Sequence, residues 1–185
     1  MSRKFLLYAA DESEAEEICE RPNKREDGIF AICFDEYKQL SLLSMFREVT
    51  APVRQDASDY SFLKAYLDGR AETGKFEDEI NAGLGNLLAK HADLEKSYCK
   101  HFKVLYSEFG DECFVTRFPD ELVEALADVD NDALPILAEQ WQAIEPGLDK
   151  AHWPRTELED LLKAVIYACK AARASKKHVL VRLSL

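Results

Sequence analysis

The sequence predicts an α+β (or α/β) fold: one helix-rich layered domain over residues 1–185, with a small sheet of three to four strands. Two patterns predict it. Four short segments have strand-like apolar patterns, and the longer segments around them repeat apolar residues every three or four positions. The composition, 47% hydrophobic and 32% charged, is that of a folded chain, and 185 residues fit one domain of roughly 100–200 residues.

Four segments are predicted to be strands. Residues 5–8 form a continuous apolar run, which is typical of a strand buried on both faces. Residues 29–34 and 113–118 are rich in β-branched and aromatic side chains. In residues 179–185 the apolar side chains alternate, so that one face carries Val179, Val181 and Leu183. These patterns leave the strand order open.

The remaining periodic segments are predicted to be helices. They cover residues 11–21, 35–48, 58–68, 76–109, 119–127, 133–144 and 156–177. The longest, 76–109, keeps its apolar residues on one face, and Gly83 and Gly85 within it indicate a kink or a later start. The last helix has the clearest start signal, because Thr156 and Glu159 have the spacing of a capping box.

The charge of the chain is unevenly distributed. Formal net charge is -11, and residues 108–132 contain one base, Arg117. The same segment holds nine carboxylates: Glu108, Asp111, Glu112, Asp120, Glu121, Glu124, Asp128, Asp130 and Asp132. Beyond Asp160 there is no acid, and the bases are Lys163, Lys170, Arg173, Lys176, Lys177 and Arg182. Such asymmetry bears on partners rather than on the fold, because the net field governs association.

The acidic segment predicts a non-enzymatic interaction module that masks a basic protein, as an inhibitor or immunity protein does. The candidate partner-binding residues are Asp120, Glu124, Asp128, Asp130, Asp132 and Trp141. We expect Phe109, Phe118 and Trp141 to be exposed beside these acids. Nucleic acid is not an expected partner, since phosphate binding is led by clustered lysine and arginine. A membrane is not expected either, because no segment approaches 18 uninterrupted apolar residues.

Two alternatives stay open. A small hydrolase-like enzyme would combine carboxylates with His101 or His152 in a cleft. The chain contains none of the common dinucleotide-binding, P-loop, zinc-protease or nucleophile-elbow motifs. An oligomeric structural subunit, such as a homodimer, would pair the final strand, 179–185, across a sheet edge.

One segment partly matches a calcium-binding EF-hand loop. Its positions 1, 3, 5 and 12 are occupied by Asp128, Asp130, Asp132 and Glu139. The match departs from the motif at Ala133, where the loop requires glycine, and at Ile136, which cannot ligate through its side chain. The alternative is an acidic interhelical loop in which Asp132 caps the next helix. We favour the loop, and expect no metal and no cofactor.

The five cysteines predict reduced, mostly buried thiols. Their number is odd, their spacing is wide, and no C-x-x-C occurs, so that neither a disulfide framework nor a zinc cluster is expected. Together with an N-terminal apolar stretch too short for a signal peptide, this favours the cytoplasm.

The histidines offer little chemistry at the sequence level. Cys99 and His101 are two apart on a predicted helix and therefore point in different directions. His91 is expected to be a core histidine on an apolar helix face. Trp153, which follows His152, is expected to pack back on the start of the last helix.

Overall fold

The computed structural model describes residues 4–21, 26–31, 34–47, 75–107, 113–145, 148 and 153–184, with side chains of the segment 75–107 from residue 82 onward. In these ranges the chain forms a five-stranded antiparallel sheet of order β2-β1-β5-β4-β3. The strands are β1 Lys4–Ala10, β2 Ile29–Phe30, β3 Lys103–Ser107, β4 Cys113–Arg117 and β5 His178–Ser184. The α+β prediction is confirmed, but the sheet has five strands rather than three to four.

Six α-helices and two 3-10 helices accompany the sheet in the described residues. The α-helices are α1 Ala15–Glu20, α2 Glu36–Ser44, α4 Lys75–His101, α5 Asp120–Ala127, α6 Leu134–Ile144 and α7 Arg155–Ser175. The 3-10 helices are η1 Glu12–Glu14 and η4 Asn131–Ala133. Six of the seven predicted helices are confirmed with shorter bounds, while the one at 58–68 lies outside the described residues.

The fifth strand, β3, lies inside the segment predicted to be one long helix. α4 ends at His101, and the buried Phe102 donates its N–H to the Tyr98 carbonyl at 2.8 Å. The chain then turns into β3, which pairs with β4 so that Val104 lies opposite Thr116. The helical spacing of Leu105 and Phe109 therefore misled the prediction, because partner strand β4 decides the conformation of such a short apolar segment.

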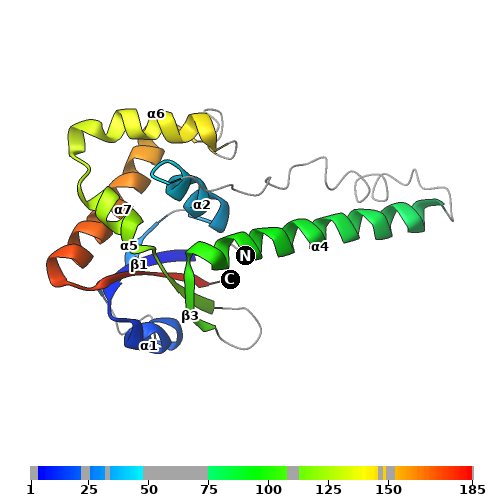
Figure 1. The fold of residues 1–185 in the computed structure, drawn as a ribbon, viewed down its shortest axis with the longest axis horizontal. Coiled ribbons are helices and arrows are strands. Elements are labelled where there is room, and N and C mark those ends of the chain that lie inside the picture. The colour runs from blue at the N-terminus through cyan, green and yellow to red at the C-terminus, as the bar shows by residue number, and fades with distance from the viewer. Residues whose placement is uncertain are drawn as a thin grey trace.

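The sheet separates two hydrophobic clusters. Figure 1 shows α2, α5, α6 and α7 on one side of the sheet and α1 on the other. In β1, Phe5 and Leu7 belong to the larger cluster, while Tyr8 and Ala10 belong to the smaller one under α1. β1 is thus buried on both faces, as predicted.

The final strand, β5, is in the middle of the sheet. Its Val181 lies opposite Leu7 of β1 and opposite Thr116 of β4. Val179, Val181 and Leu183 belong to the larger cluster, which confirms the predicted face. Since both sides of β5 are already hydrogen-bonded, the expectation that this strand pairs across an edge is wrong; the edge strands are β2 and β3.

The start of α7 differs from the prediction. The helix begins at Arg155 after the N-cap Pro154, so the predicted capping box is wrong: Glu159 instead accepts a hydrogen bond from Arg155 Nε at 3.0 Å. Trp153 is half-buried and packs against the larger cluster. At the other end, Lys176 takes a left-handed conformation (φ 57°), and Lys177 N–H caps the Ala172 carbonyl at 2.9 Å.

α4 is one continuous helix of 27 residues that projects away from the sheet (Figure 1). Gly83 and Gly85 therefore neither start nor interrupt it. Near the sheet, Leu94 and Tyr98 are buried; further out, Leu88 is 71% exposed. No helix in the described ranges is long and apolar enough to cross a bilayer.

Candidate functional site

The predicted acidic site lies on α5 and on the turn that follows it. α5 turns its apolar side chains inward, namely Leu122, Val123, Leu126 and Ala127. Its carboxylates consequently point outward, and the chain continues through Asp128 and Asp130 into η4. α5 packs against α7, so the positions of these outward carboxylates are fixed by a hydrophobic contact beneath them.

The basic C-terminal segment contacts the carboxylates of α5 and of the turn that follows it. Arg173 of α7 pairs with Asp128, reaches Glu124 at 3.6 Å, and donates to the Ala127 carbonyl at 3.0 Å. Lys170, one turn earlier, donates to the Val129 carbonyl at 2.9 Å. Two segments of opposite charge that are far apart in the sequence are therefore in contact in the fold.

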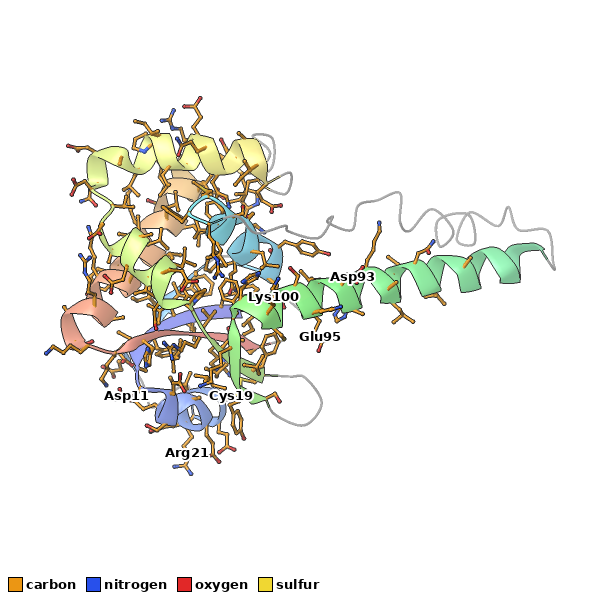
Figure 2. All side chains as sticks on the ribbon, in the orientation of Figure 1. Asp11, Cys19, Arg21, Asp93, Glu95 and Lys100 are labelled. Carbon is orange, nitrogen blue, oxygen red and sulfur yellow. A yellow bond between two sulfur atoms is a disulfide. The ribbon has the colours of Figure 1, made fainter. Side chains whose placement is uncertain are left out.

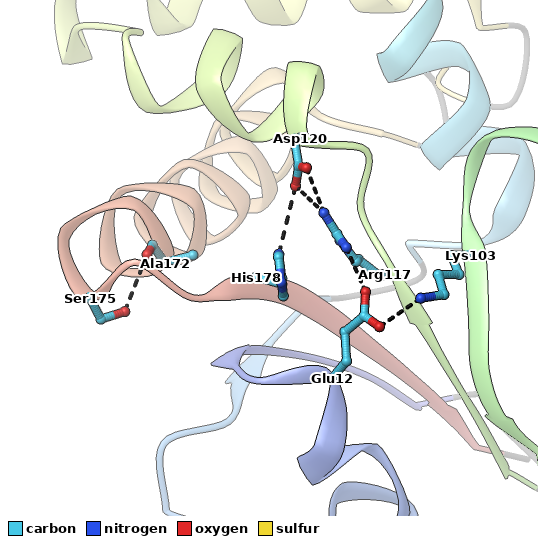
Figure 3. Close-up of polar contacts among 7 residues, drawn as sticks. All are labelled: Glu12, Lys103, Arg117, Asp120, Ala172, Ser175 and His178. Carbon is cyan, nitrogen blue, oxygen red and sulfur yellow. Dashed lines mark hydrogen bonds and ion pairs between the residues drawn. The ribbon is translucent and has the colours of Figure 1, made fainter.

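Asp120, at the first turn of α5, belongs to a second charged network (Figure 3). Arg117 donates to Asp120 and to Glu12, and Lys103 Nζ donates to Glu12 at 2.6 Å. His178 Nδ1 lies 3.7 Å from Asp120. The hydrogen bonds from Lys103 and Arg117 lower the pKa of the Glu12 carboxyl to about 2. This network joins η1, β3, β4 and α5.

Trp141 is not part of any surface. Its ring is 0% exposed, and its Nε1 donates to Ser41 Oγ at 2.8 Å in the core. Phe118 is 1% exposed, and Phe34 lies edge-on between these two rings. The expected exposure of Phe118 and Trp141 is wrong, because both side chains fill the core; Phe109 lies outside the described residues.

Of the six candidate residues, five are surface carboxylates in different situations. Asp120, Glu124 and Asp128 have arginine partners within the chain. Asp130 and Asp132, at η4, are exposed. The helix-cap role expected for Asp132 is wrong, since Ala133 is the N-cap of α6.

The calcium candidate has the loop geometry of a 3-10 turn rather than of an ion cage. Ala133 N–H donates to the backbone carbonyl of Asp130 at 3.0 Å, which closes η4. The remaining candidate ligands of the predicted calcium loop, besides Asp130, are Asp128, Asp132 and Glu139. Across the described ranges, no three acidic, histidine or cysteine side chains are grouped so that they could hold a metal ion.

Two cysteines form a disulfide. Cys19 of α1 and Cys113 of β4 are joined across 94 residues, with their Cα atoms 6.1 Å apart. The expectation of reduced thiols is wrong for this pair, because folding brings together two cysteines whose spacing gives no signal. Cys99 and Cys169 are free, and Cys33 lies outside the described residues.

Cys99 and His101 face different hollows of the surface, as the helical spacing predicts. They therefore do not form a nucleophile–base pair. His91 is exposed, which corrects its expected place in the core. Burial, together with Arg47 and Lys100, lowers the pKa of His101. His152 lies outside the described residues.

A cavity of about 430 Å³ lies between the sheet-proximal part of α4 and the ends of β3, β4 and β5. Its wall includes Leu94, Tyr98, Phe114 and Leu183. Tyr98 is held rigidly: its hydroxyl donates to Gln39 at 2.7 Å and lies 2.8 Å from Thr116 Oγ1. Its ring also stacks on Phe102 with centroids 4.5 Å apart.

The polar side chains at this cavity come mainly from one face of α4. His91, Glu95 and Cys99 follow each other at intervals of four residues, and Glu36 joins them from the first turn of α2. Figure 2 shows Glu95 on the part of α4 near the sheet. This group was not among the predicted site residues, although the four-residue spacing of His91, Glu95 and Cys99 places them on one helix face.

Comparison with known proteins gives no relative: no protein-family model, no curated protein and no solved structure matches the chain. No residue role is therefore transferred from another protein.

Proposed function

We propose that the protein is a non-enzymatic interaction module that binds a basic partner protein. The contact is made by the carboxylates of Glu124, Asp128, Asp130 and Asp132, which we call the acidic surface. The observation that carries the proposal is that these four side chains are exposed on consecutive turns of a segment fixed from below by Leu126 and its neighbours. A negative surface on a rigid support steers a positively charged partner and raises its association rate.

Arg173 is the internal competitor of such a partner. It is exposed and pairs with Asp128 and Glu124. Ion pairs between exposed side chains contribute little to stability, so exchange of Arg173 for a cation of the partner costs little. The proposal leaves out Trp141, which is buried, and Asp120, which pairs with Arg117, and keeps the four carboxylates.

The test starts with affinity purification from an extract of the source cells at low and high salt, followed by titration of the purified partner. We expect a basic protein that is retained at low salt and released at high salt. The variant Asp128→Asn/Asp130→Asn/Asp132→Asn should bind it at least about tenfold more weakly, with most of the loss in the association rate.

The matched control removes three exposed carboxylates elsewhere, in the variant Glu16→Gln/Glu17→Gln/Glu157→Gln. It changes net charge by the same amount but leaves the acidic surface intact. An equal loss of affinity in both variants would reduce the effect to net charge alone. Unchanged affinity in the Asp→Asn variant would reject the acidic surface as the binding site.

The compartment is part of the same proposal. We keep the cytoplasm as the proposed location, while the Cys19–Cys113 disulfide argues against it, because disulfides persist mainly in oxidising compartments. Alkylation of thiols at the moment of lysis, followed by mass spectrometry of the Cys19 and Cys113 peptides, distinguishes the two. Complete alkylation of both supports the cytoplasm, and a linked peptide contradicts it.

A further inference from the structure

We infer that the cavity beside α4 is a binding site for a small organic amine, that is, an ammonium group on an apolar body. The cavity volume of about 430 Å³ lies within the range of ligand pockets, roughly 300–1,000 Å³. It lies apart from the acidic surface, on α4 and the ends of the strands. The inference therefore stands or falls independently of the proposed partner protein.

The wall of the cavity fits the apolar body of such a ligand. Leu94, Tyr98 and Leu183 are buried, and Phe114 is half-buried. Because Tyr98 is fixed by Gln39, Thr116 and the stacked Phe102, this wall is already ordered without a ligand. Binding then costs little conformational entropy in the protein.

The carboxylate of Glu95 selects for a cation. It lines the cavity, and none of the described lining residues is lysine or arginine. Burial raises the pKa of the Cys99 thiol, and the negative charge of Glu95 adds to that rise. Burial also raises the pKa of the Tyr98 hydroxyl, and the charge of Glu36 adds to it. An ammonium group beside Glu95 gains a charge-assisted hydrogen bond.

The arrangement fits an organic amine better than a metal ion. A bare cation needs several ligands converging on one point, and the described part of the chain holds no such group. An ammonium needs one or two acceptors, and the remainder of the ligand is held by apolar contact. The ligand class is thus set by a polar side and an apolar wall in the same cavity.

The inference is tested by calorimetric titration of the intact protein with hexylamine, hexan-1-ol and hexanoate, which share one apolar chain and differ in the polar group. We expect hexylamine to bind at least about tenfold more tightly than either of the others, since the contact with a carboxylate is charge-assisted. Equal affinities for the amine and the alcohol, or no binding of hexylamine up to its solubility, would overturn the inference.

Two variants locate the site. Glu95→Gln should weaken hexylamine by about tenfold and leave hexan-1-ol unchanged, whereas the control Glu157→Gln, an exposed carboxylate on α7, should change neither. Val104→Trp places a large ring at the cavity from a position that is 44% exposed on an edge strand, so the fold tolerates it. It should abolish binding of both ligands at unchanged circular dichroism, and retained binding would place the amine elsewhere.

Discussion

Two regions of the molecule differ in the charges that they bring together. These regions are the contact between α5 and α7 and the cavity beside α4. At the first, the most acidic stretch of the chain meets bases from its C-terminal segment, and Arg173 pairs with Asp128 and Glu124. At the second, two acids from distant segments, Glu36 of α2 and Glu95 of α4, line the same cavity, and none of the described lining residues is lysine or arginine. The charge of a segment is thus a poor guide to the charge of a surface.

The reason is topological. β5 lies at the centre of the sheet, so α7, which precedes it, crosses the same face that α5 covers. This brings Arg173 next to a carboxylate 45 residues earlier in the chain. At the cavity, α2 and α4 each contribute one acid to the same lining, Glu36 and Glu95. The fold, and not the local composition, decides which charges come together.

The largest effect expected in a test of this comparison concerns the apolar support of each region. Leu126→Ala, which opens a void under α5, should lower the free energy of unfolding by about 2–5 kcal/mol, because Leu126 is fully buried. Leu94→Ala should cost clearly less, since Leu94 already borders a cavity and fewer contacts are lost. Urea denaturation of both variants measures the difference. Equal losses would show that the wall of the cavity is packed as tightly as the α5–α7 contact.

The same two leucines show which features the sequence can predict. The three-to-four spacing of apolar residues places Leu126 and Leu94 on inward helix faces, and both are buried. The spacing could not reveal that one leucine meets a helix and the other a cavity, because that depends on strand order and on β3. β3 itself was hidden by an apolar spacing that suits a helix as well as a strand. The exposure of Asp130 and Asp132 follows from their polar, acidic surroundings in the sequence, while the burial of Trp141 and the positions of Arg173 and Glu95 depend on long-range packing.

A smaller effect is expected at the Arg117 network, which joins α5 to the opposite side of the sheet. The folded state holds the pKa of Glu12 at about 2, below its ordinary value of 4.5. Its contribution is therefore present above pH 4.5 and is lost as the pH falls toward 2. Glu12→Gln should destabilise the protein by about 1 kcal/mol or less at neutral pH, since Glu12 is only half-buried.

Unfolding curves of the Glu12→Gln variant and the unmodified protein, measured at neutral pH and near pH 2, provide the check. The two stabilities should approach each other at the acid end, because Glu12 is then protonated in the unfolded chain and about half protonated in the folded chain, so that most of its contribution is lost. Glu16→Gln on the exposed side of α1 is the control and should show no such convergence. A constant difference at every pH would mean that Glu12 contributes through packing and not through its charge.

The smallest effect on stability, and the sharpest test of compensation, is expected from Arg173→Gln. Arg173 is exposed, so its loss should leave the unfolding midpoint unchanged. The same change frees Asp128 and Glu124 and makes the acidic surface more negative. Association with a fluorescent lysine-rich peptide should therefore become faster at low salt, and the gain should vanish at high salt.

The control is Lys163→Gln, which removes one positive charge from α7 beside Asp160. A similar gain in this control would assign the effect to net charge, whereas a gain confined to Arg173→Gln would show that the C-terminal segment normally screens the acidic surface.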